Sequence, residues 1–290
     1  MNNSTYQWGQ KKHDRTFLST SFYWLSKTAF YLAPKSVTRL MREQGFSVKP
    51  FKLSAEQDAL HQQAHRFELN FKHNKIKVYE WGTGPVILLV HGWAGRGLQL
   101  NAFIKPLLSH GFKVVAFDQK GHGESSSRFS SFPEIVRSTN LVAAHYGSEL
   151  IGVVAHSIGS NSIFKVSENI DRKLKLVIVA PMENFLGWLE KMRMKIGIDE
   201  NLFAQVVQQI EADSELRLSD LTVHDYEKIS RHDVLLVHDK FDRMNKINAS
   251  YDLLKNLSRA SLMQTERLGH SRILENQDVV DRAVAHLIQP

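Results

Sequence analysis

The stretch that decides the fold is Leu150–Ser160, LIGVVAHSIGS. Apolar residues run into Ser157, and a helical pattern begins at Ile158, which predicts a buried strand, a tight turn that exposes one hydroxyl group, and a helix. Because the turning residue adopts a strained backbone conformation, the residues two before and two after it must be small. Ala155 and Gly159 meet that requirement. A plain strand-to-helix turn with a structural serine is the alternative interpretation.

The same rhythm of strand and helix continues on both sides of this stretch. Residues 65–81 alternate as a half-buried hairpin does, and residues 86–90 form a continuous apolar run, as a strand covered on both faces requires. Strand patterns at 112–117, 174–180, 234–237 and 261–265 alternate with helical patterns at 98–108, 133–145, 251–257 and 279–288. This alternation predicts an α/β fold with a doubly wound, mostly parallel sheet.

Two regions break the alternation. Residues 182–230 show only helical spacing, and residues 1–60 are basic, aromatic-rich and helical in pattern. We therefore expect an N-terminal helical arm (1–60), an α/β core (61–181 and 231–290) and a helical cap inserted into that core (182–230). Phe185 and Trp188 lie on the apolar stripe of the cap, where they form either its core or a wall of an acyl-binding pocket.

Charge is concentrated in the arm. The 290 residues have a net charge of +7, and residues 1–50 contain eight lysines and arginines against two acidic residues. Three interpretations of the arm stay open: a helix packed on the catalytic body, which we favour, an amphipathic helix on anionic lipid, and a secretion signal. We expect a cytoplasmic protein, with peripheral membrane contact through residues 1–50 as an option. No apolar run approaches the length of a membrane span.

Polar residues follow most of the predicted sheet strands, at the edge where open α/β sheets bind ligands. Ser157 follows one strand, Asp242 lies in the loop after residues 234–237, and His270 follows the last strand. A serine hydroxyl needs a base to accept its proton, and that base needs a carboxylate to orient it. Asp239 is a rival for the role of the acid. His286, the other histidine after Asp242, falls in a helical pattern typical of a surface residue.

These motifs together resemble the α/β-hydrolase superfamily over residues 65–290. By that resemblance Ser157 is the nucleophile, Asp242 the acid and His270 the base, and the backbone N–H groups of Trp93 and Ile158 form the oxyanion hole. A substrate pocket would involve His91, Gly92, His156, Phe185 and Trp188. The motif at 118–123, DQKGHG, resembles a structural loop of the family. Ala155 stands where the family usually has glycine. Family members that act as dehalogenases or epoxide hydrolases have aspartate at the position of Ser157.

The resemblance implies an enzyme that hydrolyses carboxylic esters through an acyl-enzyme. A thioesterase, a lysophospholipase, an aminopeptidase-like enzyme and a C–C hydrolase would use the same three residues, so they stay open. A catalytically inactive binding relative and a membrane-surface adaptor are the alternatives outside catalysis. We expect a small-molecule ester or lipid-like substrate, no cofactor, no metal site and no nucleic acid, and the sequence leaves the oligomeric state open. The chain has no cysteine, which excludes disulfides and thiolate chemistry.

Overall fold

The computed structural model describes residues 17–45, 47–48, 52–167, 170–183, 185–214, 217–218 and 229–289. Packing divides the chain into two compact units, each formed from two segments. The first consists of residues 1–47 and 184–220, and we call it the helical unit. The second consists of residues 48–183 and 221–290 and is called the sheet unit. Each unit is described by itself.

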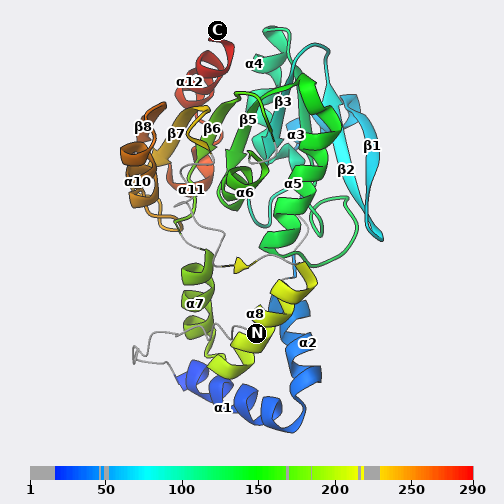
Figure 1. Ribbon diagram of the computed structural model, residues 1–290, viewed down its shortest axis with the longest axis vertical. Helices are drawn as coiled ribbons and strands as arrows, with labels where there is room; N and C mark the ends of the chain where they lie inside the picture. The colour runs from blue at the N-terminus through cyan, green and yellow to red at the C-terminus, as the bar shows by residue number, and fades with distance from the viewer. Residues whose placement is uncertain are drawn as a thin grey trace. The chain divides into compact units, whose positions relative to one another are not determined.

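The sheet unit is built on eight strands in the order β1-β2-β4-β3-β5-β6-β7-β8 (Figure 1). β1 pairs with β2 and β2 pairs with β4 in antiparallel fashion, whereas all other neighbours are parallel. The predicted doubly wound, mostly parallel sheet is confirmed. The strands are β1 (His65–Phe71), β2 (Asn74–Trp81), β3 (Val86–Val90), β4 (Lys113–Phe117), β5 (Leu150–His156), β6 (Lys175–Val179), β7 (Asp233–Asp239) and β8 (Ala260–Thr265).

Helices cover both faces of this sheet, because successive side chains of a strand point to opposite faces. On β3, Leu88 packs among residues of α5, α6 and α10, whereas Leu89 packs among residues of α3, η1, α4 and α12. Figure 1 shows α5 and α6 together on one face of the sheet. The helices of this unit are α3 (Ala55–Gln63), η1 (Gly97–Phe103), α4 (Ile104–Ser109), α5 (Phe132–Tyr146), η2 (Gly147–Glu149), α6 (Ile158–Val166), α10 (Asn248–Asn256), α11 (Gly269–Arg272) and α12 (Gln277–Ile288).

The parallel strands all end at the same edge of the sheet, and this edge positions the candidate site. Ser157 directly follows β5, a central strand whose neighbours are β3 and β6. Asp242 lies just after β7, and His270 lies in α11, which follows β8. Strands far apart in the sequence therefore bring three chemically complementary side chains to one edge.

Helix α3 belongs to the sheet unit. Its N-terminus has a capping box, in which the Ser54 hydroxyl accepts from the Gln57 N–H and the Gln57 side chain accepts from the Ser54 N–H. The indole of Trp81 on β2 donates to the carbonyl of Leu60, which is buried. Residues 48–60 are therefore grouped with the sheet unit, while we expected an arm that extends to residue 60. The three-part division of the chain stays a prediction.

The helical unit comprises α1 (Phe17–Leu32), α2 (Pro34–Gly45), α7 (Phe185–Ile196) and α8 (Glu200–Ser214). α1 packs against the other three, and α2 also packs against α8. Pro34 is the first residue of α2, a position where its missing N–H costs nothing. No described helix is long and apolar enough to cross a bilayer. Residues 215–216 and 219–228 of the predicted cap, and the basic residues Lys11, Lys12, Arg15 and Lys49, lie outside the described residues.

Candidate active site

Ser157 lies in a sharp turn between β5 and α6. Its backbone adopts φ 55° and ψ −128°, a strained conformation for a residue with a side chain. A Cβ at Gly159 would lie 2.4 Å from the carbonyl oxygen of His91 and 2.9 Å from that of Val90, so no side chain fits there. Ala155 is fully buried, and its methyl group fits at the position where the family usually has glycine.

Three side chains form a hydrogen-bonded chain at this turn. His270 Nε2 lies 3.1 Å from Ser157 Oγ, and His270 Nδ1 lies 2.7 Å from Asp242 Oδ2. A carboxylate only accepts, so Nδ1 is the nitrogen that holds the proton and Nε2 is left to accept from the serine hydroxyl. The structure thus brings together the three residues expected to be nucleophile, base and acid.

Asp242 is held as a carboxylate. Its side chain is fully buried, and Oδ1 accepts hydrogen bonds from the backbone N–H groups of Met244 (2.8 Å) and Asn245 (3.0 Å). Burial raises the pKa of this carboxyl, but the hydrogen bonds from His270 and from these two amides outweigh burial and leave the pKa lowered. The carboxyl group of Asp242 is therefore ionised where it faces His270.

Asp239, the rival acid, has other partners. Oδ2 accepts from the Leu268 N–H and the Thr265 hydroxyl, both at 2.9 Å, and Oδ1 accepts from the Phe241 N–H, also at 2.9 Å. Burial raises its pKa, but the hydrogen bond from Leu268 and its other donors leave the pKa lowered. Asp239 thus ties the end of β7 to the segment that leads into α11 and His270.

The loop after β3, which contains His91, Gly92 and Trp93 of the expected pocket and oxyanion hole, is braced by buried groups. His91 Nε2 accepts from the Gln119 N–H at 3.0 Å, so its Nδ1 donates to the carbonyl of Gly92 at 2.7 Å. His122 Nε2 accepts from the N–H of Ala94 at 3.2 Å. Burial lowers the pKa of His91 to about 4 and that of His122 to about 3. Both rings are neutral and hold the loop on either side of Trp93.

Gly92 and His156 lie directly beside Ser157. A Cβ on Gly92 would lie 3.1 Å from Ser157 Cβ and 3.0 Å from His156 Nδ1. His156 Nε2 donates to the carbonyl of His270 at 3.0 Å, and within the described part of the chain its Nδ1 has no hydrogen-bond partner. Burial lowers the pKa of His156 to about 3. His156, the residue directly before Ser157, is therefore hydrogen-bonded to the backbone of the candidate base, His270.

Asn245 is a neighbour of Ser157 that the sequence analysis missed. Its Nδ2 lies 3.4 Å from Ser157 Oγ and 2.8 Å from the carbonyl oxygen of Ala180, at the end of β6. The side chain is buried, at 6% exposure. Its place three residues after Asp242, in a loop at the functional edge of the sheet, was the available signal.

Phe185 and Trp188 both belong to α7 of the helical unit. Phe185 is buried, and the two rings stack with centroids 5.9 Å apart and planes 19° apart. A role for them in a substrate pocket stays a prediction.

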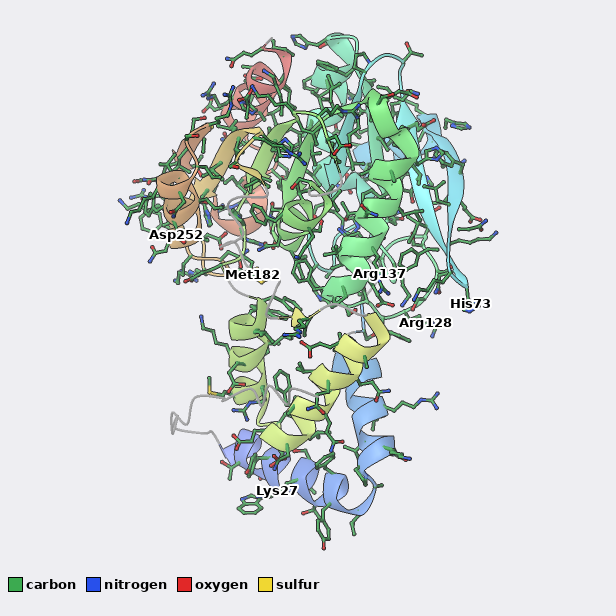
Figure 2. All side chains as sticks on the ribbon, viewed as in Figure 1. Lys27, His73, Arg128, Arg137, Met182 and Asp252 are labelled. Carbon is green, nitrogen blue, oxygen red and sulfur yellow. The ribbon has the colours of Figure 1, made fainter. Side chains whose placement is uncertain are left out.

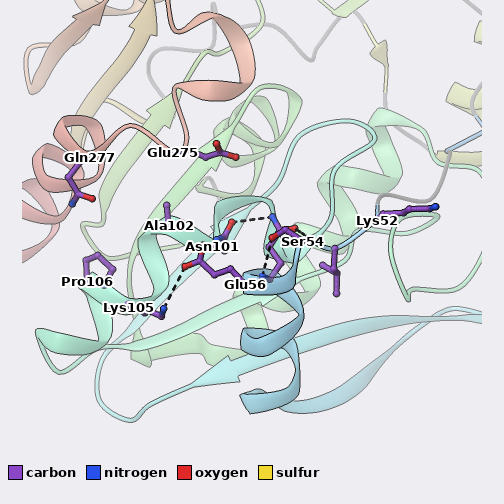
Figure 3. Close-up of a pocket in the computed structure, with 11 residues that line it drawn as sticks. Lys52, Ser54, Glu56, Asn101, Ala102, Lys105, Pro106, Glu275 and Gln277 are labelled. Atoms are coloured by element: carbon purple, nitrogen blue, oxygen red, sulfur yellow. Dashed lines mark hydrogen bonds and ion pairs between the residues drawn. The ribbon is translucent and has the colours of Figure 1, made fainter.

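A hollow of about 760 Å³ in the sheet unit contains none of the candidate site residues (Figure 3). Eleven residues of α3, the segment before it, η1, α4 and the start of α12 line it, among them Lys105, which forms an ion pair with Glu56 at 3.6 Å. Gln57, another lining residue, donates to Asn101 Oδ1 and to the carbonyl of Leu98. Because these groups satisfy one another, we do not take this hollow as the substrate site.

Comparison with known proteins identifies the family. The model of the family described as alpha/beta hydrolase fold matches residues 85–251, which is more than half of the chain and includes Ser157 and Asp242. A serine hydrolase-like protein from Danio rerio is 28% identical over 129 residues, covering 42% of this chain and 39% of its own. A soluble epoxide hydrolase from Corynebacterium sp. (strain C12) is 29% identical over 85 residues, which is 29% of each chain.

The matched stretch thus spans less than half of the length of these two curated relatives. A solved structure, assigned as a lipase from Acinetobacter baumannii AYE, superposes with a TM-score of 0.62 over 83% of this chain and 97% of its own, at 20% identity. That likeness shows the fold alone. From the family match and the eight-stranded sheet together, this chain belongs to the alpha/beta hydrolase fold family.

Proposed function

We propose that this hydrolase-family chain is a serine hydrolase that cleaves carboxylic esters of modest size. The observation behind the proposal is the hydrogen-bonded chain from Ser157 Oγ through His270 to Asp242 Oδ2. That arrangement gives a serine hydroxyl a neutral base at hydrogen-bond distance and gives the base a buried carboxylate. It also argues against the epoxide-hydrolase reaction of the Corynebacterium relative, which by the family pattern starts from an aspartate at the position of Ser157.

The reaction would proceed in two halves. Ser157 Oγ attacks the ester carbonyl carbon while His270 Nε2 takes the hydroxyl proton, and the tetrahedral intermediate expels the alcohol, which receives that proton. Water then adds to the acyl carbon and gives its proton to Nε2. The C–Oγ bond breaks, Nε2 returns the proton to Ser157 Oγ, and the carboxylic acid product leaves. Asp242 stabilises the imidazolium in both halves. We assign the oxyanion hole to the backbone N–H groups of Trp93 and Ile158, since one flanks Gly92 and the other begins α6.

The substrate pocket is proposed from the same neighbourhood. Gly92 has no side chain, which lets its backbone lie close to Ser157, while His91 and His156 hold the surrounding loops through their ring nitrogens. Residues 182–230 are proposed as the cap, and Phe185 and Trp188 as its contribution to an acyl-binding wall. A thioesterase, a lysophospholipase, an aminopeptidase-like enzyme and a C–C hydrolase would use the same catalytic groups, so the substrate test must include them.

The decisive experiment measures hydrolysis of p-nitrophenyl esters from acetate to palmitate, together with labelling by a fluorophosphonate probe. Wild type should turn over and be labelled, and Ser157→Ala should do neither. Ser160→Ala is the matched control, because the Ser160 hydroxyl donates to the carbonyls of Ala155 and Val179 and does not face His270. A folded wild type that neither reacts with the probe nor hydrolyses any ester would refute the proposal in favour of a binding protein. Labelling without turnover would keep the serine hydrolase and direct the search to thioesters, peptides and C–C bonds.

We also propose that the helical unit contacts anionic membranes, so that a lipid-like substrate is reached at the bilayer. Exposed apolar side chains gather on α1 and α2: Trp24 (59% exposed), Leu25 (68%), Tyr31 (88%), Leu32 (75%) and Leu40 (55%). Lys27, labelled on α1 in Figure 2, lies with its ammonium 5.4 Å from the ring centroid of Trp24. Aromatic rings beside cationic groups are typical of helices that lie in a membrane interface.

Vesicle co-sedimentation of the full chain tests this contact. Leu25→Ser should reduce binding to anionic vesicles, while Leu254→Ser should not, because Leu254 is a partly exposed leucine on α10 of the sheet unit. Equal binding of both variants, or no binding by wild type, would exclude the membrane contact without affecting the proposal for Ser157.

A further inference from the structure

Asn245 reaches the oxygen that would attack the substrate. Its Nδ2 has two neighbours within hydrogen-bond range, the carbonyl oxygen of Ala180 at 2.8 Å and Ser157 Oγ at 3.4 Å. A backbone carbonyl can only accept, so the amide nitrogen and not the amide oxygen must face Ala180. One N–H of the amide is used there, which leaves the second N–H for Ser157 Oγ.

The amide is held in this position from its own backbone. The Asn245 N–H donates to Asp242 Oδ1 at 3.0 Å, and its carbonyl accepts from His238 Nε2 at 3.1 Å. His238 is fully buried, and its Nδ1 accepts from the Ser250 hydroxyl at 2.7 Å. Burial lowers the pKa of His238, and because the Asn245 carbonyl can only accept, Nε2 is the nitrogen that donates. A donor fixed in this way needs no reorganisation when charge develops near it.

We propose that Asn245 is a catalytic group that activates the acyl-enzyme by donating a hydrogen bond to Ser157 Oγ once that oxygen has become an ester oxygen. This inference rests on the proposed serine-hydrolase function. Water adds to the acyl carbon and gives its proton to His270 Nε2. The C–Oγ bond then breaks, its electron pair goes to Oγ, and the proton on Nε2 transfers to Oγ. The N–H of Asn245 stabilises the negative charge that develops on Oγ in between.

The two halves of the reaction should depend on this hydrogen bond to different degrees. In the second half it withdraws electrons from the ester oxygen and stabilises the leaving group, so both effects speed hydrolysis. In the first half it stabilises the serine oxygen but also reduces its power as a nucleophile, so the effects offset each other. Loss of the donor should therefore slow hydrolysis of the acyl-enzyme more than formation of the acyl-enzyme.

The test uses Asn245→Leu, which keeps the approximate shape and removes the donors, and Asn245→Asp, which keeps the shape more closely. Asn161→Leu is the matched control. Asn161 is also a buried asparagine near the turn, but its amide binds the backbone N–H and carbonyl of Met182. Three quantities are measured on each full-length variant: the rate of labelling by the fluorophosphonate probe, kcat for p-nitrophenyl acetate, and the acylated fraction during turnover by intact-mass spectrometry.

We expect Asn245→Leu to be labelled within about 3-fold of the wild-type rate. Its kcat should fall by about 5- to 10-fold, the effect of one neutral hydrogen bond, and the acylated fraction should rise. Asn161→Leu should be less stable without a rise in the acylated fraction. Labelling and kcat that fall together with no accumulation, or that do not change, would overturn the role of Asn245. If neither Asn245 variant unfolds cooperatively, Asn245 is a structural residue and the inference is wrong.

The pH profile of kcat/KM distinguishes two roles of Asn245: a hydrogen bond to Ser157 Oγ, or support of the loop that contains Asp242. If Asn245 acts on Oγ, its replacement should leave the acidic limb of kcat/KM unchanged, because the variants keep the backbone N–H that donates to Asp242 Oδ1 and the contact between Asp242 and His270. If Asn245 merely holds the Asp242 loop, the limb should shift. Failure of the serine-hydrolase function would be visible in wild type, as absence of both labelling and acylation, whereas failure of this inference would be visible only in the variants.

Discussion

Asp239 and Asp242 lie three residues apart at the end of β7, yet of the two only Asp242 contacts the His270 ring, at 2.7 Å. Asp239 accepts from the N–H of Leu268, which lies two residues before His270 in the chain. One carboxylate faces the ring of the candidate base and the other holds the backbone that leads to it. The two acids therefore offer a paired test of catalysis against architecture.

Asp242→Asn should reduce kcat for ester hydrolysis by about 10³- to 10⁴-fold, since an amide cannot stabilise the imidazolium or fix its tautomer as the carboxylate does. Asp239→Asn should instead cost about 1–3 kcal/mol of the free energy of unfolding, because one buried donor loses its acceptor, and should reduce kcat far less. Steady-state kinetics and urea unfolding of both variants measure the difference. A greater kcat loss for Asp239→Asn would identify Asp239 as the acid.

The turn at Ser157 predicts an asymmetry between its two small neighbours. Gly159→Ala should cost about 1–3 kcal/mol and lower activity, because its Cβ would lie 2.4 Å from the carbonyl oxygen of His91 and push against the loop after β3. Ala155→Gly should cost about 1 kcal/mol, the usual penalty of glycine in a strand, and keep most activity. Thermal unfolding and ester hydrolysis of both variants provide the check. Equal activity losses would show that the close approach of Gly159 to the loop after β3 does not determine the geometry of the turn at Ser157.

Buried neutral histidines predict loss of stability in weak acid. Burial lowers the pKa of His91 to about 4 and those of His122 and His156 to about 3 in the folded chain, against about 6.5 in the unfolded chain. Below pH 6.5 the unfolded chain binds protons that the folded chain does not, so stability falls with pH until the folded values are reached. Each histidine should steepen that fall by up to about 1.4 kcal/mol per pH unit.

His122→Gln tests this dependence, because glutamine can still accept from Ala94 but does not titrate. Between pH 7 and pH 5 its unfolding free energy should fall less steeply than that of wild type. The difference in slope should correspond to about one fewer proton bound on unfolding. Urea unfolding at both pH values measures the slope. This range lies above the lowered pKa values of Asp239 and Asp242, whose stabilising effect is present above the ordinary aspartate pKa near 3.8 and is lost only below it. An unchanged slope would mean that His122 is protonated in the folded chain.

The link between His156 and the candidate base gives a further prediction. His156→Phe keeps a ring of similar size but removes the N–H that donates to the carbonyl of His270 at 3.0 Å. We expect kcat to fall by about 10-fold with KM within 2-fold of wild type, the effect of one lost hydrogen bond that orients the base. Steady-state kinetics of both proteins decide the matter. A rise in KM at constant kcat would place His156 in substrate binding, the role expected from the sequence.

The sequence predicted the sheet well because each strand has its own local signature. The apolar run 86–90 and the pattern around Ser157 correspond to β3 and to the β5–α6 turn, and the strand ends located Ser157, Asp242 and His270 at one edge. The partner of α1 could not be predicted. An apolar helical face such as that of residues 17–32 indicates that it is covered, but not that α7 and α8, more than 150 residues later, are among the elements that cover it.

Contacts made by polar side chains were the other gap. Nothing in the letters 242–245, DRMN, tells which way the amide of Asn245 points, because that depends on the carbonyl of Ala180 from a different strand. Asp239 and Asp242 had the same limitation: Asp242 fitted the motif spacing better, but Asp239 stayed a rival for the role of the acid. Their different partners follow from the positions of Leu268 and His270, which the pairing of β7 with β8 determines.

The pairing of β6 with β7 has a consequence for how this chain can vary. The two strands are hydrogen-bonded neighbours, with Val177 opposite Leu235, although the whole segment that contains α7 and α8 lies between them in the sequence. The sheet therefore fixes the two ends of that segment at opposite ends of two neighbouring parallel strands, whatever its length. Each doubling of a flexible connection costs only about 0.6 kcal/mol in loop entropy. Insertions and deletions there should leave the strand pairing intact, so this family member can acquire new surfaces between β6 and β7 while the spacing of Ser157, Asp242 and His270 is preserved.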